Sequence, residues 1–229
     1  MRINGFQKMT LLDFPGHIAC TVFTGGCNFR CPFCHNAGLV EGHSAESYTA
    51  EEILSYLQKR KGLIEGVCIT GGEPLLQPDI EEFIINIKKL GYLVKLDTNG
   101  SFPEKLISLV EKGLIDYVAM DVKNCIEKYG ETIGITDFVT DSVEKSIKFL
   151  LKGSVDYEFR TTVVKEYHTE QDIEALAQYI GGAKKYFIQQ FVDSGEILGG
   201  KLTPHTPEIL GNMRNLAKKH IQNVELRGI

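Results

Sequence analysis

The sequence predicts an α/β fold built on a parallel sheet. Short apolar runs rich in β-branched residues alternate with amphipathic helical segments, and the alternation repeats six times without a long low-complexity insert. The helical segments also carry start and stop signals at their ends. Such alternation favours right-handed βαβ crossovers, which make consecutive strands parallel. Six units are fewer than the eight of a closed barrel, so the strands are expected to curl incompletely or to lie open.

The first two units have clear boundaries. Residues 18–23 are β-branched and end at Gly25-Gly26, which predicts a buried strand. A capping box at residues 49–52 begins a helix that is expected to continue through Lys59. Residues 67–70 predict the second strand, and a helix capped at Asp79 follows and stops at Gly91. Both units therefore predict a strand followed by a crossover helix.

The remaining four units repeat this pattern. Thr206-Pro207 places an N-cap and a proline at the first helical position of the last helix. The other boundaries follow from apolar periodicity and from a cap at residues 101–104. Strands are predicted at residues 92–97, 117–122, 157–164 and 186–191, and helices at 101–113, 141–151, 169–180 and 206–220.

Composition limits the classes of function. The 229 residues are 43% hydrophobic, enough for one core, so we expect a single domain over residues 1–229 with 1–17 as an N-terminal extension. The net charge of −5 and the lack of a basic stripe argue against a nucleic-acid partner. No signal peptide and no run of roughly 18 apolar residues is present, which predicts a cytoplasmic protein without a membrane contact.

Three cysteines follow the first predicted strand in a CxxxCxxC spacing: Cys27, Cys31 and Cys34. A structural zinc site of four thiolates would need a fourth cysteine nearby, and none is present. Three soft thiolate ligands suit an iron–sulfur cluster, and a cluster of four irons would keep one iron free to bind a substrate. The other cysteines, Cys20, Cys68 and Cys125, are scattered. A place in the core is favoured for Cys20 and Cys68 over a second cluster.

Polar residues also follow the next predicted strands. They are Gly71-Gly72-Glu73, then residues 97–100, then residues 121–123. Each group alone would be typical of a turn, but the carboxyl ends of parallel strands meet at one edge, where α/β proteins form their sites. Asp97 and Asp121 would repel each other unless a cation or Lys123 lies between them; the alternative is two ordinary strand-end acids in salt bridges. Arg160 either pairs with a buried anion or faces the surface.

These motifs carry a family resemblance. The cysteine spacing with Phe33 before its last cysteine, followed by residues 70–74 (TGGEP), resembles the radical S-adenosylmethionine (SAM) superfamily. Within it, residues 12–16 (LDFPG), 23–27 (FTGGC) and 34–38 (CHNAG) resemble the activases of glycyl radical enzymes. The nearest resemblance, over almost the whole chain, is to the anaerobic ribonucleoside-triphosphate reductase activating proteins. It implies a partial (β/α)6 barrel, open on one side.

The resemblance also implies a site. Cys27, Cys31 and Cys34 would hold a 4Fe-4S cluster, and Gly71, Gly72 and Glu73 would bind the methionine part of SAM, with Glu73 accepting near its amino group. In pyruvate formate-lyase activases, the positions similar to residues 97–100 and 121–123 serve a monovalent cation and SAM. The further cofactor-binding residues that the resemblance implies are Phe33, His35, Asn36, Asp97, Thr98, Asp121, Lys123 and Arg160.

One departure separates the two activase groups. Pyruvate formate-lyase activases carry a histidine just after the sixth strand, where this chain has residues 189–193, QQFVD. That difference favours the reductase-activating group and leaves the adenine contact at this edge open. The other histidines lack ligand spacing, which predicts structural roles for His17, His43, His168, His205 and His220.

The activity implied is radical chemistry on a protein. A low-potential donor such as flavodoxin or ferredoxin would reduce the cluster, and SAM would be cleaved to methionine and a 5′-deoxyadenosyl radical. The radical would then take a hydrogen atom from a glycine of an anaerobic ribonucleotide reductase. One alternative is an activase of a pyruvate formate-lyase type enzyme, and another is a radical SAM enzyme for a small molecule, such as a deazaguanine-forming synthase. An iron–sulfur electron carrier or sensor would leave residues 71–74 and the paired aspartates unexplained.

Overall fold

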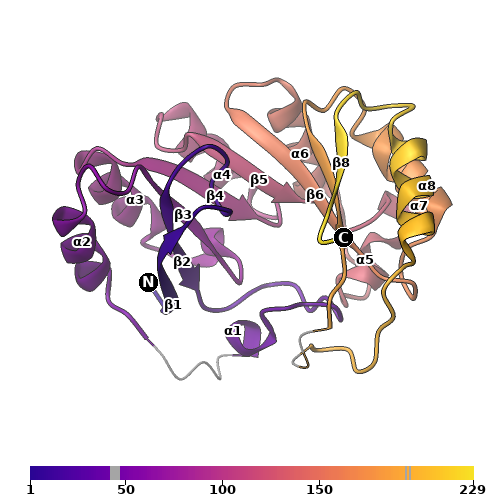
Figure 1. The fold of residues 1–229 in the computed structure, drawn as a ribbon, viewed down its shortest axis with the longest axis horizontal. Helices are drawn as coiled ribbons and strands as arrows, with labels where there is room; N and C mark the ends of the chain where they lie inside the picture. Colours follow the sequence, from indigo (N-terminus) through magenta and orange to yellow (C-terminus); the bar gives the residue numbers. More distant parts are fainter. Residues whose placement is uncertain (42–46, 194, 196) are drawn as a thin grey trace.

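The computed structural model describes residues 1–41, 47–193, 195 and 197–229. An eight-stranded sheet runs through it, and the strands lie side by side in the order of the sequence, β1 to β8. The first strand, β1 (Ile3–Thr10), is antiparallel to β2 (Ala19–Thr24), and every later pair is parallel. Helices lie along the outer side of this sheet, from α2 and α3 near one edge to α7 and α8 near the other (Figure 1).

The remaining elements alternate along the chain. After β2 the strands are β3 (Gly66–Gly71), β4 (Leu93–Thr98), β5 (Tyr117–Asp121), β6 (Asp156–Val163), β7 (Tyr186–Gln190) and β8 (Val224–Arg227). The helices are α1 (Ala37–Glu41), α2 (Ala50–Lys59), α3 (Ile80–Lys89), α4 (Pro103–Glu111), α5 (Tyr129–Thr132), α6 (Asp141–Leu151), α7 (Glu170–Tyr179) and α8 (Pro207–Ala217). Two 3₁₀ turns, η1 (Pro74–Leu76) and η2 (Ile126–Lys128), lie in the connections.

The six predicted strand–helix units are confirmed, and with them the partial barrel. β1 and β8 were not predicted from sequence, and they add one strand to each edge of the predicted sheet. Residues 3–10, within the expected N-terminal extension, form β1, although buried and exposed side chains do not alternate regularly along this strand. Edge strands depend on their neighbour more than on propensity, so local sequence gave little sign of either. His43, expected to be structural, lies outside the described residues.

The helix caps match the sequence in most places. Thr49 forms both bonds of its capping box with Glu52, and the hydroxyl of Thr206 accepts from the backbone N–H of Ile209. The cap predicted at Ser101 is wrong, because Phe102 precedes α4 and makes no side-chain cap bond. Asp79 does occupy the N-cap position of α3, but its carboxylate pairs with the N-terminal ammonium group instead of the helix.

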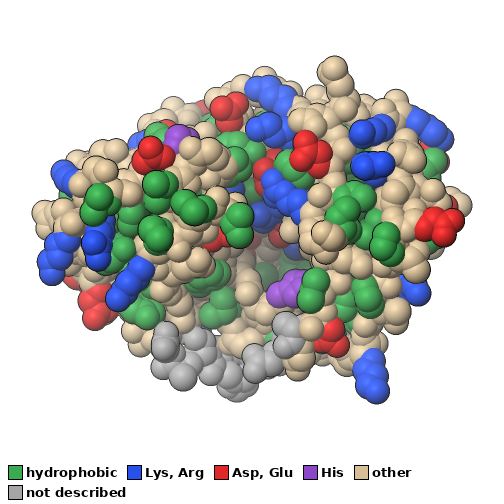
Figure 2. Space-filling model, in the orientation of Figure 1, with side chains coloured by type: hydrophobic (Ala, Val, Ile, Leu, Met, Phe, Trp, Pro, Cys, Tyr) green, Lys and Arg blue, Asp and Glu red, His purple; other side chains and the backbone are tan. Residues whose placement is uncertain are grey.

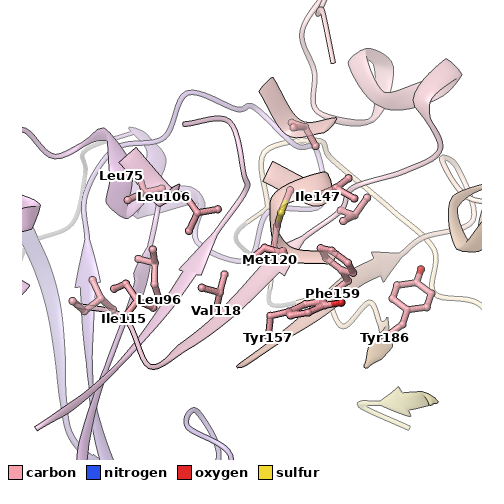
Figure 3. Packing of buried hydrophobic residues seen from close by; sticks show 14 of the residues in the cluster. Leu75, Leu96, Leu106, Ile115, Val118, Met120, Ile147, Tyr157, Phe159 and Tyr186 are labelled. Carbon is pink, nitrogen blue, oxygen red and sulfur yellow. The ribbon is translucent and has the colours of Figure 1, made fainter. Parts of the chain in front are cut away.

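The core lies between the helices and the outer face of the sheet. Alternate strand residues point to that side and pack against helical side chains (Figure 3). The strand residues include Leu96, Val118, Met120 and Phe159, and the helical residues include Leu106 and Ile147. The intervening residues point to the inner face of the curved sheet, because side chains alternate along a strand. Cys20 and Cys68 are both fully buried, as predicted; Cys20 and Cys125 pack in the main core, and Cys68 is buried on the inner face beside Lys95. None of the helices among the described residues has the length and apolarity needed to cross a membrane.

Candidate functional site

A cavity of about 280 Å³ opens at the carboxyl ends of the parallel strands. The face seen in Figure 2 is hollowed between its two sides, with charged side chains of both signs in the hollow. Residues of the cysteine loop and of the ends of β3 to β7 line the cavity. The predicted site residues among them are Cys27, Cys31, Phe33, Cys34, His35, Asn36, Gly71, Gly72, Asp97, Thr98, Asp121, Lys123 and Arg160. The structure therefore brings together almost the whole predicted set.

The three cysteines are free thiols on the loop between β2 and α1. Burial raises the pKa of the Cys31 thiol to about 12, although the charge of Lys123 opposes the rise. Burial also raises the pKa of Cys27, whose sulfur accepts the backbone N–H of Phe29 at 3.4 Å. Buried thiolates need the positive charge of a bound metal to stabilise them. The donor set thus fits a thiolate-ligated metal cluster, and Cys20, Cys68 and Cys125 do not line the cavity.

Gly71 and Gly72 hold the end of β3 tightly against this loop. A Cβ on Gly72 would lie 2.0 Å from the carbonyl oxygen of Gly26, and a Cβ on Gly71 would lie 2.4 Å from the backbone of Thr24. Gly71 also has a φ of +116°, which disfavours any side chain, and its carbonyl accepts from Asn36 Nδ2 at 3.0 Å. The glycines were expected to bind the methionine part of SAM. Here they are required by the approach of one chain segment to another, although both still line the cavity.

Glu73 differs from expectation, because its carboxylate is fully buried and does not line the cavity. Oε1 accepts from the hydroxyl of Thr98 at 2.8 Å and from the N–H of Leu75 at 3.0 Å, and Oε2 accepts from the N–H of Asn99 at 2.7 Å. Burial outweighs these bonds and raises the pKa of Glu73 to about 7. Glu73 was expected to accept from the amino group of SAM. Its side chain instead lies behind the residues that line the cavity, where the bonds to Thr98 and Asn99 fix the end of β4.

A ladder of five charged side chains crosses the inner face: Lys95, Asp97, Arg160, Asp121 and Lys123. Arg160 lies between the two aspartates, with Nη1 3.1 Å from Asp97 Oδ2 and Nε 2.8 Å from Asp121 Oδ1. Lys123 Nζ lies 2.9 Å from Asp121 Oδ2, and Lys95 pairs with Asp97. Arg160 therefore faces the interior, and it supplies with both lysines the positive charge that the aspartates require.

The ladder stays ionised in spite of its burial. Burial alone would raise the pKa of Asp97 and Asp121, but Arg160 and the adjacent lysines outweigh it and hold both carboxyl pKa values below their usual range. Three cations against two anions give the ladder one net positive charge. Lys95 was missed from sequence because it lies within an apolar strand; its spacing of two from Asp97 was the available signal, since such residues share a face.

The remaining histidines differ in position. His35 lines the cavity with its ring 5.5 Å from that of Phe191, and burial lowers the pKa of its imidazole. His17 lies 3.1 Å from Glu65, away from the cavity lining. His168 and His205 each bond a backbone carbonyl, of Lys123 and His168 respectively. Further lining residues, not predicted as site residues, are Phe29, Val40, Thr70, Asn99, Thr162 and Gln189.

Comparison with known proteins places this geometry in a family. A family model described as the radical SAM superfamily matches residues 21–180. A Methanocaldococcus jannaschii protein assigned as a glycyl-radical enzyme activating enzyme is 34% identical over 99% of this chain and 96% of its own length. The pyruvate formate-lyase-activating enzyme of Clostridium pasteurianum is 30% identical over 81% of this chain and 85% of its own length.

A solved structure shares the fold. Streptococcus suis SuiB bound to S-adenosylmethionine superposes with a TM-score of 0.71 at 16% identity, over 90% of this chain and 49% of SuiB. The chain thus spans about half the length of SuiB, and the likeness concerns the fold. The family model covers most of the chain, and the M. jannaschii relative covers nearly all of it. This chain therefore belongs to the radical SAM superfamily and, within it, to the enzymes that activate glycyl radical enzymes.

Proposed function

We propose that this activase forms the glycyl radical of an anaerobic ribonucleotide reductase. Its class as an activase rests on family membership, and the choice of target rests on the sequence. The resemblance to the reductase-activating group runs through residues 12–38, and residues 189–193, at the end of β7 and just after it, contain no histidine. Gln189 instead lines the cavity at that edge. The electron donor we propose is a low-potential protein such as flavodoxin or ferredoxin.

We assign Cys27, Cys31 and Cys34 as the ligands of the 4Fe-4S cluster that radical SAM enzymes carry. The single observation that carries the assignment is that these three thiols alone among the described cysteines line the cavity. When bound, the cluster and SAM supply one-electron cleavage of SAM to methionine and a 5′-deoxyadenosyl radical, which takes the hydrogen atom of the target glycine. The protein contributes ligands, orientation and exclusion of water.

The charged ladder would hold the carboxylate of SAM. Two of its cations, Lys123 and Arg160, line the cavity together with Asp97 and Asp121, and the third cation, Lys95, lies behind the lining beside Asp97. The backbone of Gly71 and Gly72 would face the amino group of SAM, because both glycines line the cavity, where the carbonyl of Gly71 also accepts from Asn36. By family resemblance, Phe33, His35 and Asn36 would also contact SAM. Thr98, whose hydroxyl is already bonded to Glu73, would contribute mainly to the shape of the wall.

A monovalent cation at Asp97 and Asp121 is a second possible source of positive charge. Arg160 already bonds both aspartates. Titration with K⁺ distinguishes the two sources: tighter SAM binding with added K⁺ would support a cation, and an unchanged affinity would assign the charge to Arg160 and the lysines.

The target is tested by mixing the reconstituted protein anaerobically with SAM, a strong one-electron reductant and an anaerobic ribonucleotide reductase from the same organism. The expected result is a doublet EPR signal near the free-electron position, whose splitting collapses when the α-hydrogen of the glycine is replaced by deuterium. Cleavage of SAM to 5′-deoxyadenosine without a radical on the reductase would refute this target but not the radical SAM chemistry. The Cys31→Ser variant, which lacks one proposed cluster ligand, is the control.

A pyruvate formate-lyase type enzyme is the second candidate target, because activases of that enzyme are relatives of this chain at 28–30% identity. The same assay with that protein in place of the reductase separates the two. A radical that forms only on the pyruvate formate-lyase type protein would assign this chain to that group. Turnover of a small molecule without any protein radical would favour a different class of radical SAM enzyme.

A further inference from the structure

The backbone of Lys123 is held from both sides by two buried rings. Its N–H donates to the hydroxyl of Tyr129 at 3.3 Å, and its carbonyl accepts from Nε2 of His168 at 2.8 Å. Tyr129 is 0% exposed and His168 is 1% exposed. Lys123 lies beyond the end of β5, which stops at Asp121. The preceding residue, Val122, still bonds β6 through its N–H and its carbonyl, whereas the N–H and carbonyl of Lys123 itself bond no strand. The two rings supply the bonds that a strand would otherwise provide.

The protonation state of His168 is set by its surroundings. Its Nδ1 accepts from the backbone N–H of Val164 at 3.2 Å, which requires the hydrogen to be on Nε2, where it points to the carbonyl of Lys123. Burial lowers the pKa of His168 to about 4, so the ring is neutral at ordinary pH. His205 also lies near it, with Nε2 2.9 Å from the carbonyl oxygen of His168. The described contacts thus account for both nitrogens of the His168 ring.

Both rings also touch the cysteine loop. The ring of His168 lies edge-on to the ring of Phe33, with the two centroids 5.7 Å apart. The ring of Tyr129 lies edge-on to the ring of Phe29, with the centroids 6.5 Å apart. Phe138 joins the second contact, because it stacks on Tyr129 at 5.8 Å and meets Phe29 at 5.4 Å. Phe29 and Phe33 stand on either side of Cys31 in the sequence. Each ring therefore bonds Lys123 on one side and packs against the loop on the other.

We propose that Tyr129 and His168 are positioning residues that fix Lys123 relative to the cysteine loop, so that its ammonium group is preset for the carboxylate of SAM. The inference rests on the proposed binding of SAM at this cavity. A lysine has a flexible stem of four carbons, and ordering it on binding would reduce the affinity for a ligand. Pinning the peptide, while Asp121 holds Nζ at 2.9 Å, removes part of that cost before SAM arrives.

The test compares the dissociation constant of SAM for the reconstituted wild type and for the Tyr129→Phe and His168→Phe variants, measured anaerobically by calorimetric titration. Each substitution keeps a ring and removes one bond to Lys123; His168→Phe also removes the acceptor of the Val164 N–H, so Tyr129→Phe is the more specific of the two. We expect binding roughly three- to tenfold weaker in each variant, because SAM must then order a lysine side chain that the wild type holds in advance. Tyr157→Phe is the matched control, because Tyr157 is 2% exposed and its hydroxyl also accepts a backbone N–H at 3.3 Å, that of Lys184, which does not line the cavity. Its affinity for SAM should equal that of the wild type.

The background of Lys123→Met separates positioning from general loosening. Without the ammonium group, Tyr129→Phe should cause no further loss of SAM affinity, whereas a merely structural role would weaken binding again by the same factor. Faster amide exchange at Lys123 in Tyr129→Phe, measured by mass spectrometry, checks the lost bond directly. If His168→Phe fails to fold, Tyr129→Phe still decides the outcome.

Two results would overturn the inference: unchanged SAM affinity in Tyr129→Phe, or an equal loss with and without Lys123. Failure of the proposed function looks different, because then the reconstituted wild type would not bind SAM, or Lys123→Met would bind it as tightly as the wild type does. Weaker binding in the Tyr157→Phe control would also count against the inference, since it would show that loss of any buried tyrosine hydroxyl has the same effect.

Discussion

Arg227 in β8 forms a bidentate ion pair with Glu158 in β6, with Nη1 and Nη2 2.7 and 3.0 Å from the two carboxylate oxygens. The pair spans β7, on which Phe187 lies under the guanidinium at 3.3 Å from its ring centroid. Glu158 is 1% exposed and also accepts from the hydroxyl of Tyr117 at 2.9 Å. The four-residue strand β8 is thus tied to the sheet by side chains as well as by its backbone ladder.

Arg227→Met should destabilise the protein by about 3 kcal/mol, because it leaves the carboxylate of Glu158 buried without its cation. A chain of this size should then melt roughly 10 °C lower in a thermal scan. Adding Glu158→Gln to Arg227→Met should recover part of the loss, since the uncompensated charge is removed. A melting temperature within 1 °C of the wild type for Arg227→Met would show that the pair contributes little.

Glu73→Gln should lower stability by about 1–3 kcal/mol although it preserves the shape of the side chain. The carboxylate accepts from three donors, and the amide would place an N–H₂ group against one of them. Glu82→Gln, at an exposed site of α3, is the matched control and should stay within about 0.5 kcal/mol of the wild type. Equal denaturation midpoints for both variants would show that the three hydrogen bonds of Glu73 do not stabilise the fold.

Substitutions at the six cysteines should fall into two sets, according to whether the variant protein still binds the iron–sulfur cluster. Serine at Cys27, Cys31 or Cys34 should abolish the four-iron EPR and Mössbauer signature of the reconstituted protein, because each removes one of three thiolate ligands. Alanine at Cys20, Cys68 and Cys125 together should keep that signature, since none of them lines the cavity. Loss of the cluster in the triple alanine variant, with the protein still folded, would contradict the ligand assignment.

Asp97→Asn and Asp121→Asn should both weaken SAM binding while the iron content stays unchanged. Each variant frees Arg160 from one of its two partners and so moves the guanidinium within the cavity. Asp97→Asn should also cost more stability, because it leaves Lys95 buried without an anion, whereas the lysine partner of Asp121 lines the cavity. Unchanged SAM affinity in both variants would make the aspartates ordinary structural acids.

The free energy of unfolding should fall as the pH is lowered, because His168 is harder to protonate in the folded chain. Its pKa is about 4 in the folded chain against an ordinary 6.5, so the unfolded chain binds the proton more tightly. The contribution of His168 is therefore complete above pH 6.5 and is lost as the pH falls towards 4, by about 3 kcal/mol in all. In urea titrations, His168→Phe should be less harmful at pH 4.5 than at pH 7.5. An equal loss at both values would show that the ring does not resist protonation.

The amino-acid sequence by itself determined the repeated strand–helix units and the place of the cysteine loop. Apolar periodicity, capping residues and glycine stops act over a few residues, so local sequence is enough to read them. The handedness of βαβ crossovers then orders the strands, and polar residues after successive strands must meet at one edge. That is why residues far apart in the chain, such as Cys27, Asp97 and Asp121, could be assigned to one edge of the sheet, whereas only the family resemblance placed Arg160 there.

Tertiary structure alone decided what depends on a partner from elsewhere in the chain. β8 is four residues long, and it exists because β7 pairs with it and Glu158 holds Arg227. Glu73 points away from the cavity because three donors on η1 and on the end of β4 satisfy it better there. Lys95 is charged and buried only because Asp97 lies beside it. In each case the deciding energy is a hydrogen bond or an ion pair between distant segments, which no local pattern encodes.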